Sequence, residues 1–345
     1  MVHGPVLKHQ PSDFLVRENM VLRLRDDPGA AQRYMLLRKD GYTTTEAVRW
    51  IAEKLALGTG EVTFGGLKDE DGITEQVVAV PRHALSEEDG QLRLVEGEHR
   101  WLSLHHYGYG DEPIEIGALE GNGFRVVVRN VTASLAEHLS SLRKMNLLFL
   151  NYYDTQRFGV PDGPKRTHHV GAAILAGDWE LARTELAGLR APESEQAANW
   201  TGDAKTLFTT LDPRTTAFYL AAQSSFRWNA ELAARAAEVF DDDSVEIELD
   251  GLKYLYPTSG DAAAALMAHC RELPFRKYTF ADTRPVSRLS PRPTLVQTTV
   301  TISGFAPDEH HPGAFEVTLG FFLPSGCYAT AAVRQLMTIV SAGKP

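Results

Sequence analysis

Residues 65–76 read GGLKDEDGITEQ and place three consecutive acidic side chains among glycines. On either side of them, residues 61–66 and 75–80 are rich in Val, Phe and Thr, a composition typical of β-strands. Because Asp and Gly favour turns, the acidic stretch is predicted to be a loop that joins two strands. It lacks the further oxygen ligands of an EF-hand calcium loop. Taken alone, it is most simply a polar turn.

The segments around this loop alternate between helix and strand character. Residues 43–57 have apolar side chains at helical spacing after threonines that can cap a helix, and residues 123–131 are predicted to form a strand. From about residue 177 the composition shifts toward Ala, and helices are predicted over 178–189, 215–240 and 261–272. One face of the second helix would carry Phe218, Ala222, Ser225, Asn229 and Leu232. Residues 282–304 are predicted to be loops and strands, and the last segment a strand, a turn at 324–326 and a helix.

The length and composition indicate an ordinary globular protein. A chain of 345 residues suggests two domains or one with a large insertion. Two cysteines do not make a disulfide framework, and no Cys-x-x-Cys pair is present, so a reducing compartment is expected. The start of the sequence lacks the apolar run of a signal peptide, and no apolar segment approaches the length of a membrane span. We therefore expect a cytoplasmic protein without membrane contact.

The net charge of −10 disfavours nonspecific adhesion to nucleic acid, so a polyanionic partner would need a local basic surface. Two sets of basic residues are candidates, although solvated faces explain such sets more often than binding grooves do. The first set is Arg33, Arg38, Lys39 and Arg49, and the second is Arg143, Lys144, Arg157, Lys165, Arg166, His168 and His169.

Several kinds of site lack support in the sequence. Adjacent histidines occur at 105–106, 168–169 and 310–311, but neighbouring side chains point in different directions and chelate a metal poorly. We therefore predict no metal. The sequence has no Gly-x-Gly-x-x-Gly after a strand, no Walker motif and no Gly-x-Ser-x-Gly. A nucleotide cofactor and serine-hydrolase chemistry are thus not expected.

Six segments, taken in order, change the interpretation of the acidic loop. They are DFLVRE at 13–18, GGLKDEDGITEQ at 65–76, GALEGNGF at 117–124 with Arg129 beyond it, NYYDTQRFG at 151–159, AAQSSFRWN at 221–229, and FFLPSGCYAT at 321–330 with Arg334 beyond it. In this order and spacing they resemble the TruD family of pseudouridine synthases, from Lys8 to Arg334. Six ordered matches are far more specific than any single one.

The resemblance implies an α+β fold. A pseudouridine synthase catalytic domain, with a mixed, largely antiparallel sheet and flanking helices, would occupy residues 1–172 and 300–345. A mainly helical insertion domain of the TRUD type would occupy residues 173–299. The compositional change near residue 177 agrees with that interruption.

The resemblance also assigns site residues. The catalytic carboxylate falls on Asp69, and Lys8 falls where the family places a lysine near it. The substrate-binding positions fall on Phe14, Asn151 and Tyr328. From the residues alone, Phe14 could be a core aromatic, Asn151 a residue that orders a loop, Tyr328 a turn aromatic and Lys8 a surface lysine. Buried polar residues need partners, so Gln156, Arg157, Gln223 and Asn229 are interpreted as architectural.

The implied reaction breaks the bond from ribose C1′ to uracil N1 and joins C5 to C1′. Nothing is oxidised or lost, so no cofactor is needed. A carboxylate can attack the sugar or the base, or deprotonate the sugar, and the sequence does not separate these routes. A nearby cation would keep it ionised, and an aromatic ring would stack on the detached base.

Three hypotheses follow for the substrate. The first is a uridine in tRNA, the family's usual substrate, which would be flipped out of its stack. The second is a free uridine nucleotide such as UMP, used in making C-nucleosides, and the third is an inactive RNA-binding module. Asp154 stands where the family usually has Gly and is expected to add a negative charge beside Asn151 that would repel a phosphate backbone. The sequence gives neither the target position nor the oligomeric state.

Overall fold

The computed structural model describes residues 4–27, 29–68, 70, 72–86, 89–97, 100–160, 163–281 and 283–343. The chain divides into two compact units. Unit 1 comprises residues 1–146 and 298–326, and unit 2 comprises residues 147–297 and 327–345. This division does not test the bounds 1–172, 173–299 and 300–345 predicted for the family's domains, which stay a prediction.

Unit 1 is built around a large mixed sheet. Its elements are β1 (Val6–Leu7), the short 3₁₀ helix η1 (Pro11–Asp13), β2 (Phe14–Met20), β3 (Gln32–Asp40), α1 (Thr44–Lys54), β4 (Thr63–Phe64), β5 (Ile73–Pro81), β6 (Gln91–Val95), β7 (Trp101–Gly110), β8 (Leu119–Val131), α2 (Ala133–Leu142) and β15 (Phe315–Pro324). Strands β9 (Lys144–Leu150) and β14 (Leu295–Pro307) start in one unit and end in the other.

The strand order of this sheet is β6-β7-β3-β5-β2-β8-β15-β14-β9. Strands β2 and β5 pair in parallel, with Leu15 opposite Ile73. In contrast, β2 and β8, β8 and β15, β3 and β5, and β3 and β7 pair antiparallel. The sheet is thus mixed and largely antiparallel, as predicted. Because β2 lies between β5 and β8, three of the recognised sequence motifs come together in its centre.

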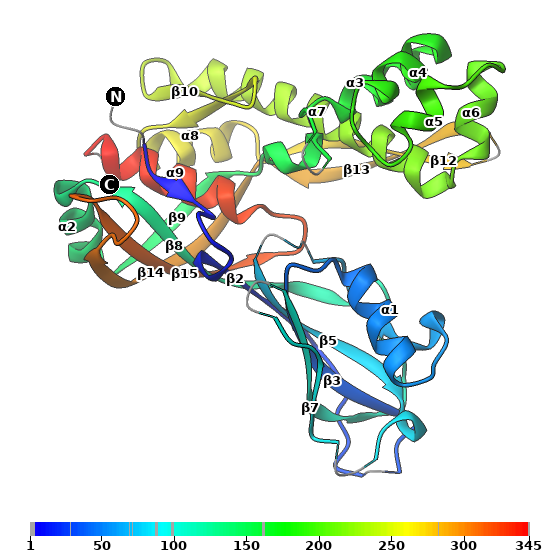
Figure 1. The fold of residues 1–345 in the computed structure, drawn as a ribbon. Coiled ribbons are helices and arrows are strands. Elements are labelled where there is room, and N and C mark those ends of the chain that lie inside the picture. The colour runs from blue at the N-terminus through cyan, green and yellow to red at the C-terminus, as the bar shows by residue number, and fades with distance from the viewer. Residues whose placement is uncertain are drawn as a thin grey trace. The chain divides into compact units, whose positions relative to one another are not determined.

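Helix α1 covers one face of β3, β5 and β7 (Figure 1). It begins after Thr43, whose hydroxyl accepts a hydrogen bond from the backbone of Glu46 while the Glu46 carboxylate accepts one from the backbone of Thr43. Its apolar stripe, which includes Val48 and Ile51, is buried against the strands. The helix predicted over residues 43–57 is therefore confirmed.

Unit 2 contains most of the helices. Its elements are α3 (Thr167–Ala176), α4 (Trp179–Ala187), α5 (Ser194–Ala198), α6 (Ala204–Thr210), α7 (Pro213–Phe240), β10 (Ser244–Leu249), β11 (Leu252–Pro257), α8 (Gly260–His269), β12 (Glu272–Ala281), β13 (Arg284–Pro293) and α9 (Ala329–Ser341). In Figure 1, α7 runs from the group α3–α6 to the hairpin of β10 and β11.

The predicted face of α7 is confirmed for most of its members. Ala222, Ser225, Asn229 and Leu232 are buried, and Phe218 is half-buried. The Asn229 side chain accepts a hydrogen bond from the backbone N–H of Tyr153 at 2.9 Å and donates one to its carbonyl oxygen at 2.8 Å. Asn229 is therefore architectural, as interpreted from the sequence.

Two antiparallel hairpins lie among these helices, one of β10 and β11 and one of β12 and β13. The first was not predicted. Its signal is present in the sequence, since SVEIEL alternates apolar and acidic residues before Asp250-Gly251, and both turn residues have positive φ angles of 51° and 78°. Asp-Gly at such a turn is a strong hairpin signal.

Candidate active site

The acidic loop is anchored at Lys68, the residue before Asp69. The backbone N–H of Lys68 donates to Thr44 Oγ1 at 2.8 Å, and its carbonyl oxygen accepts from Lys39 Nζ at 3.3 Å. The Lys68 ammonium lies 2.5 Å from Glu18 Oε2, and both side chains are almost fully buried. Asp69 itself lies outside the described residues, but the chain position next to it is fixed by three separate contacts.

The Lys68–Glu18 pair is a structural contact. Burial raises the pKa of Glu18, and the charge of Lys68 only partly offsets that increase. Removing either partner would leave the other charge buried without compensation, which is strongly unfavourable. The Lys68 ammonium is therefore committed to Glu18. Lys8 remains the lysine that the resemblance assigns to the catalytic carboxylate.

The other end of the loop approaches Phe14 closely. A Cβ atom on Gly72 would lie 2.5 Å from the Phe14 carbonyl oxygen and 3.4 Å from its ring, which is closer than any side chain could pack. Just beyond this point, the parallel pairing of β2 and β5 begins at Leu15 and Ile73. Glycine is thus required here by close approach, and the loop that contains Asp69 ends against Phe14.

Phe14 and Lys8 are brought together within unit 1. Lys8 Nζ lies 4.5 Å from the centroid of the Phe14 ring, a cation–π distance. Phe14 is 7% exposed and also packs on Phe124, at 5.9 Å between centroids. Lys8 has a positive φ of 55°, a conformation that is uncommon for a residue with a side chain. The ammonium group of this residue lies over the ring.

A buried charge cluster holds the segment that precedes Phe14. Arg129 donates two hydrogen bonds of 2.8 Å to Asp13, one of 3.1 Å to Asp308 and one of 2.6 Å to Glu316. Hydrogen bonds to these carboxylates raise the pKa of Arg129 above its usual range. Burial alone would raise the pKa of Asp308, but hydrogen bonds from two backbone N–H groups, a histidine and Arg129 outweigh burial and lower it. Asp13 adjoins Phe14, so the cluster fixes the start of β2.

Asn151 is held in unit 2 by backbone and side-chain contacts and is 2% exposed. Its Oδ1 accepts a hydrogen bond from Arg292 Nη2 at 2.8 Å, and its Nδ2 donates to the Pro293 carbonyl oxygen at 3.0 Å. Its own carbonyl oxygen accepts a hydrogen bond from Trp228 Nε1 at 2.9 Å. These contacts set the orientation of the amide, so both of its polar ends are used within the protein.

The Arg292 guanidinium lies among aromatic rings, 4.3 Å from the ring centroid of Tyr153, 5.2 Å from that of Trp228 and 5.7 Å from that of Phe275. Tyr153 in turn makes an edge contact with Tyr328, at 5.7 Å between centroids. The structure therefore connects the predicted residues Asn151 and Tyr328 through Arg292 and Tyr153. Sequence reasoning missed Arg292, because an arginine between two prolines carries no motif.

The repulsion of a phosphate backbone that was expected from Asp154 is wrong, because this carboxylate is buried and paired. Asp154 is 3% exposed, accepts a hydrogen bond of 2.6 Å from Thr330 and forms an ion pair with Arg334. The acid that replaces the family's usual Gly is therefore compensated by an internal cation. It does not present a free negative charge to a phosphate backbone.

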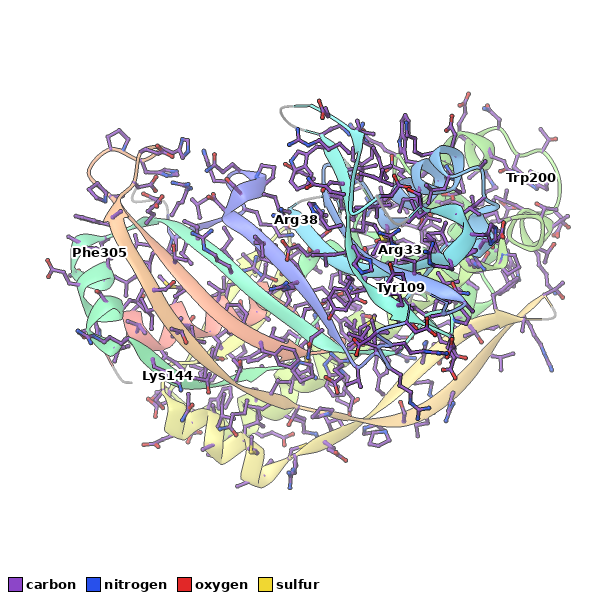
Figure 2. The ribbon with its side chains drawn as sticks, turned by 90° about the horizontal axis from the view of Figure 1, so that it is seen from below. Arg33, Arg38, Tyr109, Lys144, Trp200 and Phe305 are labelled. Carbon is purple, nitrogen blue, oxygen red and sulfur yellow. The ribbon has the colours of Figure 1, made fainter. Side chains whose placement is uncertain are left out.

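The first basic set predicted from the sequence does not form a surface. Arg33 is 1% exposed and donates to the carbonyl oxygen of Asp89, and Lys39 is fully buried. Figure 2 shows Arg33 beside Tyr109, with Arg38 further along the same strand. Arg38 is paired with Glu75 at 2.9 Å. These cations are used in packing β3 against its neighbours.

The residues of the second basic set are distributed over both units. Arg143 and Lys144 belong to unit 1, and the rest belong to unit 2. Arg166 pairs with Glu185 at 2.7 Å. Burial, together with nearby positive groups, lowers the pKa of His168 to about 4, so this side chain is neutral at pH 7. The set therefore supplies less positive charge than its composition indicates.

Among the described residues, no three His, Cys, Asp or Glu side chains gather in a way that could hold a metal ion. In the same residues, no helix has the length and apolar character needed to cross a membrane.

Comparisons with known proteins find relatives named as tRNA pseudouridine synthases. The chain is 35% identical to tRNA pseudouridine synthase D of Aquifex aeolicus over 156 residues, which are 44% of this chain and 39% of that protein. It is 25% identical to a probable tRNA pseudouridine synthase D of Methanococcus maripaludis over 96% of this chain and 99% of the relative. The match thus spans about two fifths of the Aquifex protein and nearly all of the Methanococcus one.

The fold is also similar to that of a solved structure. A putative tRNA pseudouridine synthase D from Methanosarcina mazei superposes with a TM-score of 0.61, covering 97% of this chain and 93% of that one at 18% identity. This confirms the α+β fold class predicted from the sequence. Residues 2–200 match the family model for tRNA pseudouridine synthase D, TruD. On the evidence of that match, which includes the anchored loop, Phe14 and Asn151, the chain is a member of the TruD family.

Proposed function

We propose that this protein is a pseudouridine synthase that isomerises a uridine in tRNA. The observation that carries the proposal is the fixed frame around the acidic loop, with Lys68 anchored at one end and Gly72 packed against Phe14 at the other. We propose that the catalytic carboxylate of this loop acts beside the Phe14 ring. Membership of the TruD family and the names of the relatives support the same reaction.

In the proposed reaction, Asp69 acts as the catalytic carboxylate. It attacks the sugar or the base, or removes a proton from the sugar, while the bond between C1′ and N1 breaks. After the uracil rotates, C5 bonds to C1′ while the bond to Asp69 breaks or the sugar regains its proton, and the C5 proton is released as N1 takes one up. The reaction is an isomerisation and needs no cofactor.

Lys8 is proposed to stabilise the charge of Asp69, and Phe14 is proposed to hold the detached uracil. A cation near Asp69 would favour its ionised form in a partly dry pocket. Phe14 would provide a ring for the uracil to stack on while it is not bonded to the sugar. The 4.5 Å separation between Lys8 Nζ and the Phe14 ring supports a joint role.

In unit 2, Asn151 and Tyr328 are proposed to contact the substrate. Each end of the Asn151 amide has a partner in the protein, so the proposed contact with a uracil edge would use the second acceptor site of Oδ1 or the second N–H of Nδ2. Tyr328 is partly exposed and is supported from one side by Tyr153. An aromatic ring held in this way can stack on a base.

We favour tRNA over a free uridine nucleotide as the substrate. The argument from sequence for a small substrate rested on the overall acidity of the chain and on departures from the family's pattern, including the negative charge at Asp154. That side chain is buried and paired with Arg334, so it offers no charge repulsion to an RNA backbone. The names of the relatives support the same choice.

Tritium release tests the proposal. Purified protein is incubated with tRNA or UMP that carries tritium at uridine C5, and release from tRNA is expected. Asp69→Asn should abolish release, whereas the matched control Asp71→Asn in the same loop should retain most of it. Release from UMP alone would refute the tRNA assignment, and release from neither substrate would favour a binding module without activity. Equal activity of the two variants would refute the role of Asp69.

A further inference from the structure

The hairpin of β12 and β13 is basic, whereas the whole chain is acidic. The whole chain has 45 acidic and 35 basic residues. Residues 271–293 instead contain six basic residues and two acidic ones. The basic residues are Arg271, Arg276, Lys277, Arg284, Arg288 and Arg292. This segment is therefore a local positive region on an acidic protein.

The strand register places four of these cations on one face of the hairpin. Arg284, Arg288 and Arg292 are spaced by four residues on β13, and side chains an even number of residues apart share a face. Lys277 of β12 is directly opposite Arg288 and so points to the same side. Glu272 pairs with Pro293, one position out of phase with this set, and lies on the opposite face. We call Lys277, Arg284, Arg288 and Arg292 the cationic face.

Toward its outer end, the hairpin uses the opposite face for packing, whereas near the foot Leu273 and Phe275, which lie on the same side as Lys277, pack in the core around α7 and β11. Tyr278 and Phe280 lie one position out of phase with Lys277 and pack against the buried core of α3 to α7. In Figure 1 the hairpin runs along these helices. Lys277, Arg284 and Arg288, by contrast, are exposed. Near its outer end, the hairpin thus turns one side to the helices and presents the cationic face to solvent.

The exposed cations are available to a ligand. Within the described part of unit 2, no carboxylate forms an ion pair with Lys277, Arg284 or Arg288. At the foot of the hairpin, Arg292 donates to Asn151, which belongs to the candidate site. The cationic face therefore begins at a proposed substrate-binding residue and continues outward along β13.

We propose that the cationic face binds the phosphate backbone of an RNA substrate. From Arg284 to Arg292 the strand spans about 26 Å, at about 3.3 Å per residue. A line of cations of this length matches several phosphates of an RNA strand, whereas one nucleotide would need a single cation or pocket. This inference rests on the proposed function, since it identifies the surface on which a tRNA substrate would lie.

The test compares two doubly substituted proteins. Lys277→Gln with Arg288→Gln removes two charges from the cationic face. The control, Arg235→Gln with Lys253→Gln, removes two exposed cations of unit 2 from α7 and β11. Binding of an unmodified tRNA transcript is measured over a range of KCl concentrations, and tritium release is measured with tRNA and with UMP. Thermal unfolding verifies that both proteins are folded.

We expect the first variant to bind tRNA at least tenfold more weakly than the control. The slope of log K against log salt should become shallower by about 1.4 to 1.8, because each lost phosphate contact contributes about 0.7 to 0.9. Turnover at saturating tRNA should change little. Binding and slope equal to those of the control would overturn the inference, as would a wild-type protein that does not bind tRNA. Failure of the proposed function is separate, since it would appear as a wild-type protein that binds tRNA without releasing tritium.

Discussion

Replacement of Arg129 by Gln gives a demanding test of how the site is supported. In the wild-type protein Arg129 donates to three carboxylates, and Asp13 and Asp308 are both almost fully buried. Glutamine cannot reproduce the two-pronged contact with Asp13, and it carries no charge. Breaking a buried ion pair from one side costs about 3 to 5 kcal/mol. We expect the variant to lose that amount of folding free energy at pH 7.

Because 1.4 kcal/mol corresponds to a tenfold change in an equilibrium constant, the unfolded fraction should rise by about a hundredfold or more. Urea unfolding, followed by circular dichroism and tryptophan fluorescence, measures the difference. Arg125→Gln is the matched control, because Arg125 lies on the same strand but is exposed. A surface change of this kind should shift stability by no more than about 0.5 kcal/mol.

The difference between wild type and Arg129→Gln should also depend on pH. The pKa of Asp308 is lowered in the folded protein, so the stability that this carboxylate contributes is present above its unfolded pKa. That contribution is lost as the pH falls toward the folded value. Arg129 supplies one of the hydrogen bonds that lower this pKa, so without it the Asp308 carboxylate is protonated more easily and acid reduces the penalty. The gap should therefore narrow below about pH 4. A gap of less than 1 kcal/mol at pH 7, or one that is independent of pH, would refute this account.

Three further substitutions test other parts of the site. Gly72→Ala should lower turnover at least tenfold while the protein remains folded, because the added methyl group would displace the backbone of Phe14. A normal kcat in the tritium-release assay would show that the close packing of Gly72 on Phe14 does not matter for the reaction. Arg292→Lys should lower kcat more than it raises KM, since lysine cannot both stack on the aromatic rings and orient the Asn151 amide. An unchanged kcat would show that Arg292 does not position Asn151 for the reaction. Asp154→Asn should lower the free energy of unfolding in urea by about 3 kcal/mol, because the Arg334 guanidinium loses its partner. A change below about 1 kcal/mol would show that water solvates this guanidinium in place of Asp154.

Local sequence patterns predict the helices and strands in which apolar residues recur at a regular spacing. The helix α7 and the strands β8 and β15 have apolar periods that are long enough to be diagnostic. The hairpin of β10 and β11 has an equally clear local signal at Asp250-Gly251, where both φ angles are positive. Local patterns could not predict that Lys39 is fully buried, because its ammonium is satisfied by carbonyl oxygens of Tyr42 and Lys68.

The partners of the candidate site residues are distant in sequence. Arg129 is 116 residues from Asp13, and Arg292 is 141 residues from Asn151. No spacing rule joins such residues, so the resemblance to a family identified the positions but not what holds them. The cationic face was missed for a related reason. Its members become one surface only when the register of β12 and β13 places Lys277 opposite Arg288.

Buried charges occur directly beside the predicted site residues. Lys68 precedes Asp69 and pairs with Glu18, and Asp13 precedes Phe14 and pairs with Arg129. A buried ion pair is weak evidence for stability, because desolvation can cost as much as the attraction returns. Its geometry, however, is far more restrictive than that of an apolar contact, since a small shift leaves both charges without partners. The desolvation cost of these buried pairs therefore occurs next to Asp69 and Phe14, the residues whose positions the proposed reaction depends on. Replacing Glu18 and Lys68 together by Gln and Met should consequently change stability much less than either single change, yet still reduce tritium release from tRNA. Wild-type turnover in the double variant would show that this pair does not position the loop.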